Sequence, residues 1–146
     1  MDESINLLQK IKQEFDCKDV DLRTYSPLTL AFLGDCVYDI IIRTVVVERG
    51  NRATQGLHKK KSYLVNAKTQ KELIESIQDL LTPEEEDIYR RGRNAKSYTT
   101  AKNASVGDYR KATGFEALLG YLYLDDKMDR VLFLVKEGLK RISAEI

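Results

Sequence analysis

The sequence predicts an all-α domain built around one long central helix. Apolar residues recur at helical spacing over most of the chain, and residues that favour helix starts precede these periodic stretches. No stretch alternates between apolar and polar residues with the period of two that a half-buried strand requires. A chain of 146 residues is long enough for one domain with its own core, so we expect a single helical domain over residues 1–146.

The central helix is predicted over residues 26–50. Ser26 can cap its first turn, Pro27 suits the first helical position, and Gly50 can end it. Its body is apolar on almost every side, which is typical of a helix that its neighbours bury. Cys36 lies in this apolar body, and we expect it to pack in the core.

One helix is predicted before the central helix and one after it. Residues 4–16 have the pattern of a short amphipathic helix. Its apolar residues at helical spacing are Ile5, Leu8, Ile11 and Phe15. A polar connection over 18–25 leads to the central helix, and a turn over 51–53 follows it. The next helix fits one long segment, 54–80, with lysines mostly in its first half and acids in its second.

A short helix begins at the Thr82-Pro83 pair. Thr82 can cap it, Pro83 suits its first position, and Glu85 completes a capping box. We expect this helix to end near Gly92. The residues that follow, 93–104, are basic and polar and lack apolar periodicity, which predicts a loop.

The last two helices are predicted over about 105–124 and 127–142. Ser105 and Asp108 form a second capping box at the start of the first of them. Both helices carry apolar residues at helical spacing, and two aspartates interrupt the pattern between them. We expect the apolar faces of both helices to pack against the core.

The net charge of +1 conceals an uneven distribution of charge along the chain. Residues 58–71 carry five lysines and no acid, and residues 72–87 carry seven acids and no base. Residues 88–113 carry seven bases and one acid. A single run of this kind is typical of a solvated helix face. Two basic runs, one of them joined to a loop with glycine and asparagine, favour a polyanionic partner.

The cysteine content and the N-terminus indicate the compartment. Cys17 and Cys36 are too few for a disulfide framework, which favours free thiols in a reducing environment. The acidic N-terminus lacks the apolar stretch of a signal peptide, and the longest apolar runs are shorter than a membrane span. We therefore expect a cytoplasmic protein with no membrane partner.

Two carboxylates lie in apolar helices, where an unpaired carboxylate is costly. Asp35 lies in the central helix beside small residues, and Glu116 has small residues one turn before and after it. These small residues are Ala31 and Gly34 in the first helix and Ala112 and Gly120 in the second. Small residues let two helices approach closely, so we expect Asp35 and Glu116 to meet with a cation between them. Oxygen ligands suit Mg²⁺, with Mn²⁺ as a substitute, rather than zinc.

For each acid, a salt bridge is a simpler alternative to a metal site. Asp35 shares a helical stripe with Arg43 and could be neutralised there by a salt bridge, and Glu116 could pair with a nearby lysine. His58, the only histidine, precedes Lys59 and suits a surface or phosphate-facing role better than that of a catalytic base. The sequence contains no P-loop and no glycine-rich dinucleotide motif.

Around the two acids, the sequence resembles a known family. Residues 30–35, LAFLGD, resemble the signature helix of the ribonuclease III catalytic domain, and residues 115–125, FEALLGYLYLD, resemble its second acidic helix. Residues 57–60, LHKK, and 91–97, RGRNAKS, resemble segments of the short Mini-III branch of this family. The resemblance covers about residues 28–126.

The resemblance implies a homodimer that cleaves double-stranded RNA in a Mg²⁺-dependent reaction and leaves 5′-phosphate and 3′-hydroxyl ends. It assigns catalysis and metal binding to Asp35 and Glu116, and a contact across the two-fold axis to Phe32. The Mini-III branch matures the ends of 23S ribosomal RNA precursors, and the resemblance leaves room for a ribosomal protein that presents the RNA. We expect no double-stranded RNA-binding domain, so RNA contact falls to this domain. The candidate RNA-binding residues are His58, Lys59, Lys60, Arg91, Arg93, Asn94, Lys96 and Ser97.

Two positions depart from the family pattern. Ala31 and Thr113 stand where the family has a further Glu and a further Asp, which leaves the number of metal ions open. The missing acids also keep an alternative function in view, because some domains of this fold have lost their acids and serve as non-catalytic RNA-bound scaffolds. The presence of both Asp35 and Glu116 favours the enzyme. A third alternative, an unrelated helical interaction protein, would leave the two basic segments unexplained.

Overall fold

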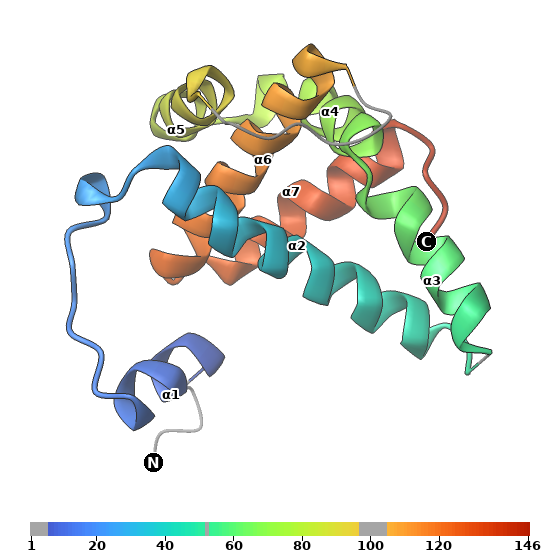
Figure 1. The fold of residues 1–146 in the computed structure, drawn as a ribbon, viewed down its shortest axis with the longest axis horizontal. Coiled ribbons are helices and arrows are strands. Elements are labelled where there is room, and N and C mark those ends of the chain that lie inside the picture. Colours follow the sequence, from blue (N-terminus) through green and yellow to red (C-terminus); the bar gives the residue numbers. More distant parts are fainter. Residues whose placement is uncertain (1–5, 52, 97–104) are drawn as a thin grey trace.

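The helix α2, Pro27–Glu48, runs across the molecule, and the other long helices pack around it (Figure 1). The computed structural model describes residues 6–51, 53–96 and 105–146. The other α-helices are α1 (Leu7–Glu14), α3 (Thr54–Val65), α4 (Ala67–Ser76), α5 (Pro83–Asn94), α6 (Val106–Leu124) and α7 (Met128–Arg141). Two 3₁₀ helices, η1 (Leu22–Thr24) and η2 (Gln78–Leu80), lie in the connections. Within these described ranges there is no strand, which confirms the all-α prediction.

The predicted helix starts are confirmed by their capping hydrogen bonds. The Ser26 hydroxyl accepts a hydrogen bond from the backbone N–H of Thr29 at 3.2 Å. Thr82 and Glu85 form the reciprocal capping box of α5. At the start of α6, the Ser105 hydroxyl accepts a hydrogen bond from the backbone N–H of Asp108 at 3.0 Å. The N-cap residues that the sequence indicated therefore fix where α2, α5 and α6 begin.

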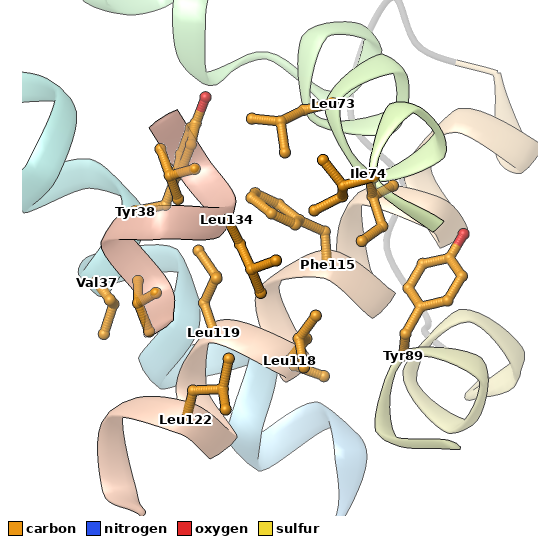
Figure 2. Close-up of a cluster of buried hydrophobic side chains, with 14 of the residues drawn as sticks. Val37, Tyr38, Leu73, Ile74, Tyr89, Phe115, Leu118, Leu119, Leu122 and Leu134 are labelled. Carbon is orange, nitrogen blue, oxygen red and sulfur yellow. The ribbon is translucent and has the colours of Figure 1, made fainter. Parts of the chain in front are cut away.

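The core lies between α2, α4, α6 and α7 (Figure 2). Tyr38 of α2 meets Phe115 of α6 edge to face, with ring centroids 5.4 Å apart. Leu73 of α4 and Leu134 of α7 are fully buried in the same cluster. The Tyr38 hydroxyl donates to the backbone carbonyl of Leu64 at 2.7 Å, so the one polar atom of this ring is satisfied in the core.

The prediction of one helix over 54–80 is wrong, because the segment forms α3 and α4 with a break at Asn66. Asn66 has an extended backbone, and its side chain accepts a hydrogen bond from Thr69 N at 2.8 Å, which caps α4. The apolar periodicity continues through the break, so spacing alone could not reveal it. Asparagine competes with the helix by capping the next one.

The predicted end of α5 near Gly92 is two residues early, since the helix continues to Asn94. Gly92 is buried against α6 instead. A Cβ atom at Gly92 would lie 2.9 Å from the Cβ of Ala117 and 2.9 Å from the Cα of Gly114. This glycine therefore permits a close approach of α5 and α6 and does not act as a helix stop.

The prediction that α2 is buried on every side is also wrong. Phe32 is 80% exposed and Ile40 is 58% exposed, and Cys36 between them is exposed rather than packed in the core. These three residues lie four apart and form one apolar stripe, which we call the α2 stripe. In α1, Phe15 at the C-cap is likewise exposed, whereas Leu8 is buried as predicted. The other described helices of the chain therefore leave the α2 stripe exposed, although its residues are apolar.

None of the helices in the described ranges has the length and apolar character needed to span a membrane.

Candidate active site

Asp35 and Glu116 meet where α2 crosses α6. Two glycines let the helices touch there. A Cβ atom on Gly34 would lie 1.7 Å from the backbone oxygen of Glu116, and one on Gly120 would lie 2.0 Å from the backbone oxygen of Leu30. No side chain other than hydrogen fits at either position. This backbone contact brings the two carboxyl groups within hydrogen-bonding reach of each other.

The electrostatics of Glu116 are those of a carboxyl group held beside another acid. Burial is the largest cause, and together with the charge of Asp35 and a hydrogen bond with Asp35 it raises the pKa of Glu116 to about 8. A hydrogen bond from the amide of Gln70 acts in the opposite direction. Glu116 is partly buried and Asp35 is exposed, so solvent reaches the pair from the α2 side. Without a cation, Glu116 therefore retains a proton at neutral pH.

The salt-bridge alternatives for these acids are not realised in the described parts of the chain. Arg43 bonds to Asp39, with 2.7 Å between its Nε and a carboxylate oxygen, and the Nζ of Lys61 lies 3.8 Å from the same carboxylate. No ion pair among the described residues involves Asp35 or Glu116. When both carboxyl groups are ionised, no basic side chain in the described ranges relieves their repulsion, which favours a bound cation.

The donor set fits a hard divalent ion. In the described ranges, no group of three or more His, Cys, Asp and Glu side chains is placed to hold a metal, so the carboxylates at this point are the pair alone. Ala31 has no donor atom, and the hydroxyl of Thr113 donates to the backbone oxygen of Tyr109 at 3.0 Å within α6. Two carboxylates with room for water match the preference of Mg²⁺, which usually retains several water ligands.

The two predicted basic segments lie apart on the molecule, near the two ends of α2, and do not form one patch. His58, Lys59 and Lys60 belong to α3. In Figure 1, α5 lies near the N-terminal end of α2 and α3 lies near its C-terminal end. The side chains of His58 and Lys59 are exposed, and Lys60 is partly buried. Any single RNA duplex that touches both segments of one chain must therefore extend along the molecule.

The second basic segment lies at the C-terminal end of α5. Arg91 and Lys96 are exposed, while Arg93 stacks over the ring of Tyr89 with its guanidinium carbon 5.6 Å from the ring centre. The Nε of Arg93 also donates to Asn94 Oδ1 at 3.3 Å. Ser97, the remaining RNA-binding candidate, lies outside the described residues, as do most residues of the predicted loop.

Sequence comparison decides the family. The family model for the ribonuclease III domain matches residues 28–127, which contain both acids and the α2–α6 crossing. The chain belongs to the ribonuclease III family. The predicted relation to this family and the fold expected from it are thus confirmed.

Relatives within the ribonuclease III family are similar over most of their length. A Mini-ribonuclease 3 from Thermoanaerobacter sp. (strain X514) is 55% identical over 118 residues, which are 81% of this chain and 83% of the relative. The Mini-ribonuclease 3 of Enterococcus faecalis is 43% identical over 84% of this chain and 95% of the relative. A crystal structure from Fusobacterium nucleatum superposes with a TM-score of 0.75 at 32% identity, covering 84% of this chain and 98% of that one.

Family membership gives the coarse activity, that of a ribonuclease III-type endoribonuclease. Helices α1 and α7 lie outside the matched residues, whereas α2 to α6 lie within them. The ribonuclease III match also includes Gln70 of α4, which the sequence did not single out. A glutamine in a polar helix gives no signal of burial, so only the structure reveals that it lies beside Glu116.

Proposed function

We propose that this chain is a Mg²⁺-dependent endoribonuclease that cleaves double-stranded RNA and leaves 5′-phosphate and 3′-hydroxyl ends. We propose further that it acts in the cytoplasm on the ends of 23S ribosomal RNA precursors. The observation that carries the catalytic proposal is the direct contact between Asp35 and Glu116, without a basic partner in the described chain. The match to Mini-ribonuclease 3 proteins supports the choice of RNA as substrate.

Asp35 and Glu116 are the residues that would hold the metal. To hold the ion, Glu116 would release to solvent the proton that burial and Asp35 favour in the metal-free protein, because a metal-binding carboxyl group is ionised. When bound, Mg²⁺ supplies Lewis-acid activation of the scissile phosphate and of the water that attacks it. The exposed side of Asp35 leaves this pair open to a phosphate group from outside the fold.

The basic residues of α3 and α5 are proposed to hold the phosphate backbone. A-form RNA has a narrow major groove, so recognition of a duplex depends on shape, phosphates and 2′-hydroxyl groups more than on base edges. Arg91 and Lys96 have exposed side chains and no ion pair among the described residues, and so do Lys59 and His58. These side chains remain available to an RNA phosphate.

A homodimer is proposed from the α2 stripe of Phe32, Cys36 and Ile40. Large apolar side chains at this level of exposure favour a protein interface, and Phe32 is the most exposed of them. Two copies related by a two-fold axis at Phe32 would present two acid pairs and two copies of each basic segment to one duplex. Each acid pair would then cut one strand. A ribosomal protein that presents the RNA is a further proposed partner.

The test is cleavage of a long, plain RNA duplex by the purified protein in Mg²⁺, in Mn²⁺ and in chelator. The Glu116→Gln variant removes one acid of the pair, and Asp129→Asn on α7 removes an exposed acid elsewhere as a matched control. We expect metal-dependent cutting by the wild type and the control and none by Glu116→Gln. Mapping the ends of a 23S precursor fragment after digestion then tests the rRNA substrate.

Binding of the duplex without cleavage in either metal would contradict the nuclease and favour the scaffold alternative. Equal cleavage by the wild type and Glu116→Gln would remove the metal role of the acid pair. Cleavage of plain duplex with no cut at the ends of the precursor would leave the nuclease and contradict the rRNA proposal.

A further inference from the structure

Gln70, in the first turn of α4, has a buried side-chain oxygen that lacks a hydrogen-bond partner in the described part of the chain. The residue is 3% exposed. Its Nε2 donates to the backbone carbonyl of Val65 at 2.9 Å, but its Oε1 is buried and has no hydrogen-bond partner among the described residues. A buried carbonyl oxygen without a partner costs roughly 1–3 kcal/mol. Buried polar atoms in native proteins nearly always have a partner, which can be a protein group, an ordered water or an ion.

The position of this amide is fixed from the end of α3. Three consecutive backbone carbonyls, from Tyr63 to Val65, each accept a side-chain hydrogen bond. Thr69 Oγ1 donates to the first at 2.8 Å, Tyr38 of α2 to the second at 2.7 Å, and Gln70 to the third. The break at Asn66 ends α3, so these carbonyls are free to accept hydrogen bonds from side chains. One of these bonds, to Val65, fixes the Gln70 side chain. The amide is therefore pre-organised before any ligand binds.

The amide lies against the acid pair. The Gln70 side chain interacts by hydrogen bonding with the carboxyl group of Glu116, which in turn contacts Asp35. The unsatisfied Oε1 is bonded to the same amide carbon as the nitrogen that interacts with Glu116, so it also lies near that carboxyl group. Amide carbonyls are among the oxygen ligands that hard divalent cations accept in proteins. In the described ranges, no third His, Cys, Asp or Glu side chain is placed with the pair, so two carboxyl groups alone leave most positions around a metal ion unfilled by protein.

We propose that the Oε1 atom of Gln70 is a third protein oxygen of the Mg²⁺ site that Asp35 and Glu116 form. The proposal rests on the proposed function, because it requires that the acid pair binds a metal. It accounts for two observations together, the buried unpaired oxygen and the small number of carboxylates.

The test measures Mn²⁺ binding to the RNA-free protein by electron paramagnetic resonance, with wild type, Asp35→Asn, Gln70→Leu and Gln70→Glu. Gln70→Leu removes the oxygen, and we expect metal affinity to fall by about 10- to 100-fold. Gln70→Glu keeps an oxygen at this position but cannot donate to Val65, so we expect affinity at least equal to wild type. Both variants lose the hydrogen bond to Val65. Without metal, Gln70→Glu should lose more thermal stability than Gln70→Leu, because it adds a buried carboxyl group beside Glu116.

Gln78 offers a matched control. Its Nε2 donates to the backbone oxygen of Ile74 at 3.1 Å at the end of α4, and its side chain is partly buried. Gln78→Leu removes a hydrogen bond of the same kind, and Gln78→Glu adds a carboxylate in the same way. We expect both Gln78 variants to bind Mn²⁺ within about threefold of wild type, because Gln78 is not assigned to the acid pair.

Three results would overturn the inference. If Asp35→Asn loses Mn²⁺ but Gln70→Leu keeps wild-type affinity, the metal site stands and the role of Gln70 is wrong. If Gln70→Glu binds Mn²⁺ as weakly as Gln70→Leu, Gln70 contributes only its hydrogen bond to the backbone oxygen of Val65 and is not a metal ligand. If wild type binds no better than Asp35→Asn, the proposed metal site fails, and the inference fails with it.

Discussion

Gly34 of α2 and Gly120 of α6 pack backbone to backbone. A Cβ atom on Gly34 would lie 2.9 Å from the backbone nitrogen of Gly120, and one on Gly120 would lie 3.1 Å from that of Gly34. This contact sets the distance between the helices that carry Asp35 and Glu116. The geometry of the acid pair therefore depends on two residues that have no side-chain chemistry.

We expect Gly34→Ala and Gly120→Ala each to destabilise the fold by about 3 kcal/mol or more, because the added methyl group overlaps a backbone oxygen of the facing helix. Gly107→Ala is the matched control. A Cβ there meets only Ser105 Oγ at 3.9 Å, so alanine should be neutral or stabilising by up to about 1 kcal/mol. Urea unfolding measures all three. Equal stabilities for Gly34→Ala and Gly107→Ala would show that the helices can separate freely.

In the metal-free protein, stability should fall as pH rises from about 5 to about 8. The pKa of Glu116 is about 8 in the fold against an ordinary 4.5, so the folded state binds more protons than the unfolded state over this range. Raising the pH then favours unfolding. Glu116→Gln removes this effect, so its melting temperature should exceed that of wild type at about pH 8 and match it near pH 4.5.

In saturating Mg²⁺ at about pH 8, the wild type should instead melt at a higher temperature than Glu116→Gln, since only the wild type gains stability from metal binding. Asp129→Asn, which removes an exposed acid from α7, should keep the pH dependence of wild type. Parallel pH profiles for wild type and Glu116→Gln would contradict the raised pKa.

Arg91→Ala combined with Lys96→Ala should weaken binding to duplex RNA and flatten its salt dependence. Each lost phosphate contact is expected to lower the slope of log affinity against log salt by about 1. Both side chains are exposed, so the fold should be unaffected. Lys136→Ala with Lys140→Ala removes the same charge from exposed positions of α7. If both double variants lose affinity equally, net charge rather than the end of α5 is responsible.

Phe32→Ser should weaken the proposed dimer without destabilising the single chain. The side chain is 80% exposed, so it contributes little to the core, whereas aromatic residues at interface centres are typically worth about 2 kcal/mol or more. Analytical ultracentrifugation over a concentration series should show at least about tenfold weaker association. Val106→Ser, at a residue 56% exposed on α6, is the control. Unchanged association of Phe32→Ser would place any dimer contact elsewhere.

Much of the fold follows from local residue patterns. Ser26, Thr82 and Ser105 stand at the starts of α2, α5 and α6, and each caps its helix as predicted. Caps and apolar spacing act within a few residues, so they can be read without knowledge of the fold. The break at Asn66 is the exception, because the same side chain could lie on a continuous helix or cap a new one.

The sequence by itself determined that two carboxylates lie on apolar helices among small residues, and hence that Asp35 and Glu116 could meet. Only the tertiary structure decided that Arg43 pairs with Asp39, that Phe32 and Cys36 face outward, and that Gln70 borders the acids. The physical reason is one of range. Periodicity specifies which side chains share a face of one helix. Which atoms that face meets depends on packing between segments far apart in the chain, such as α4 against α6.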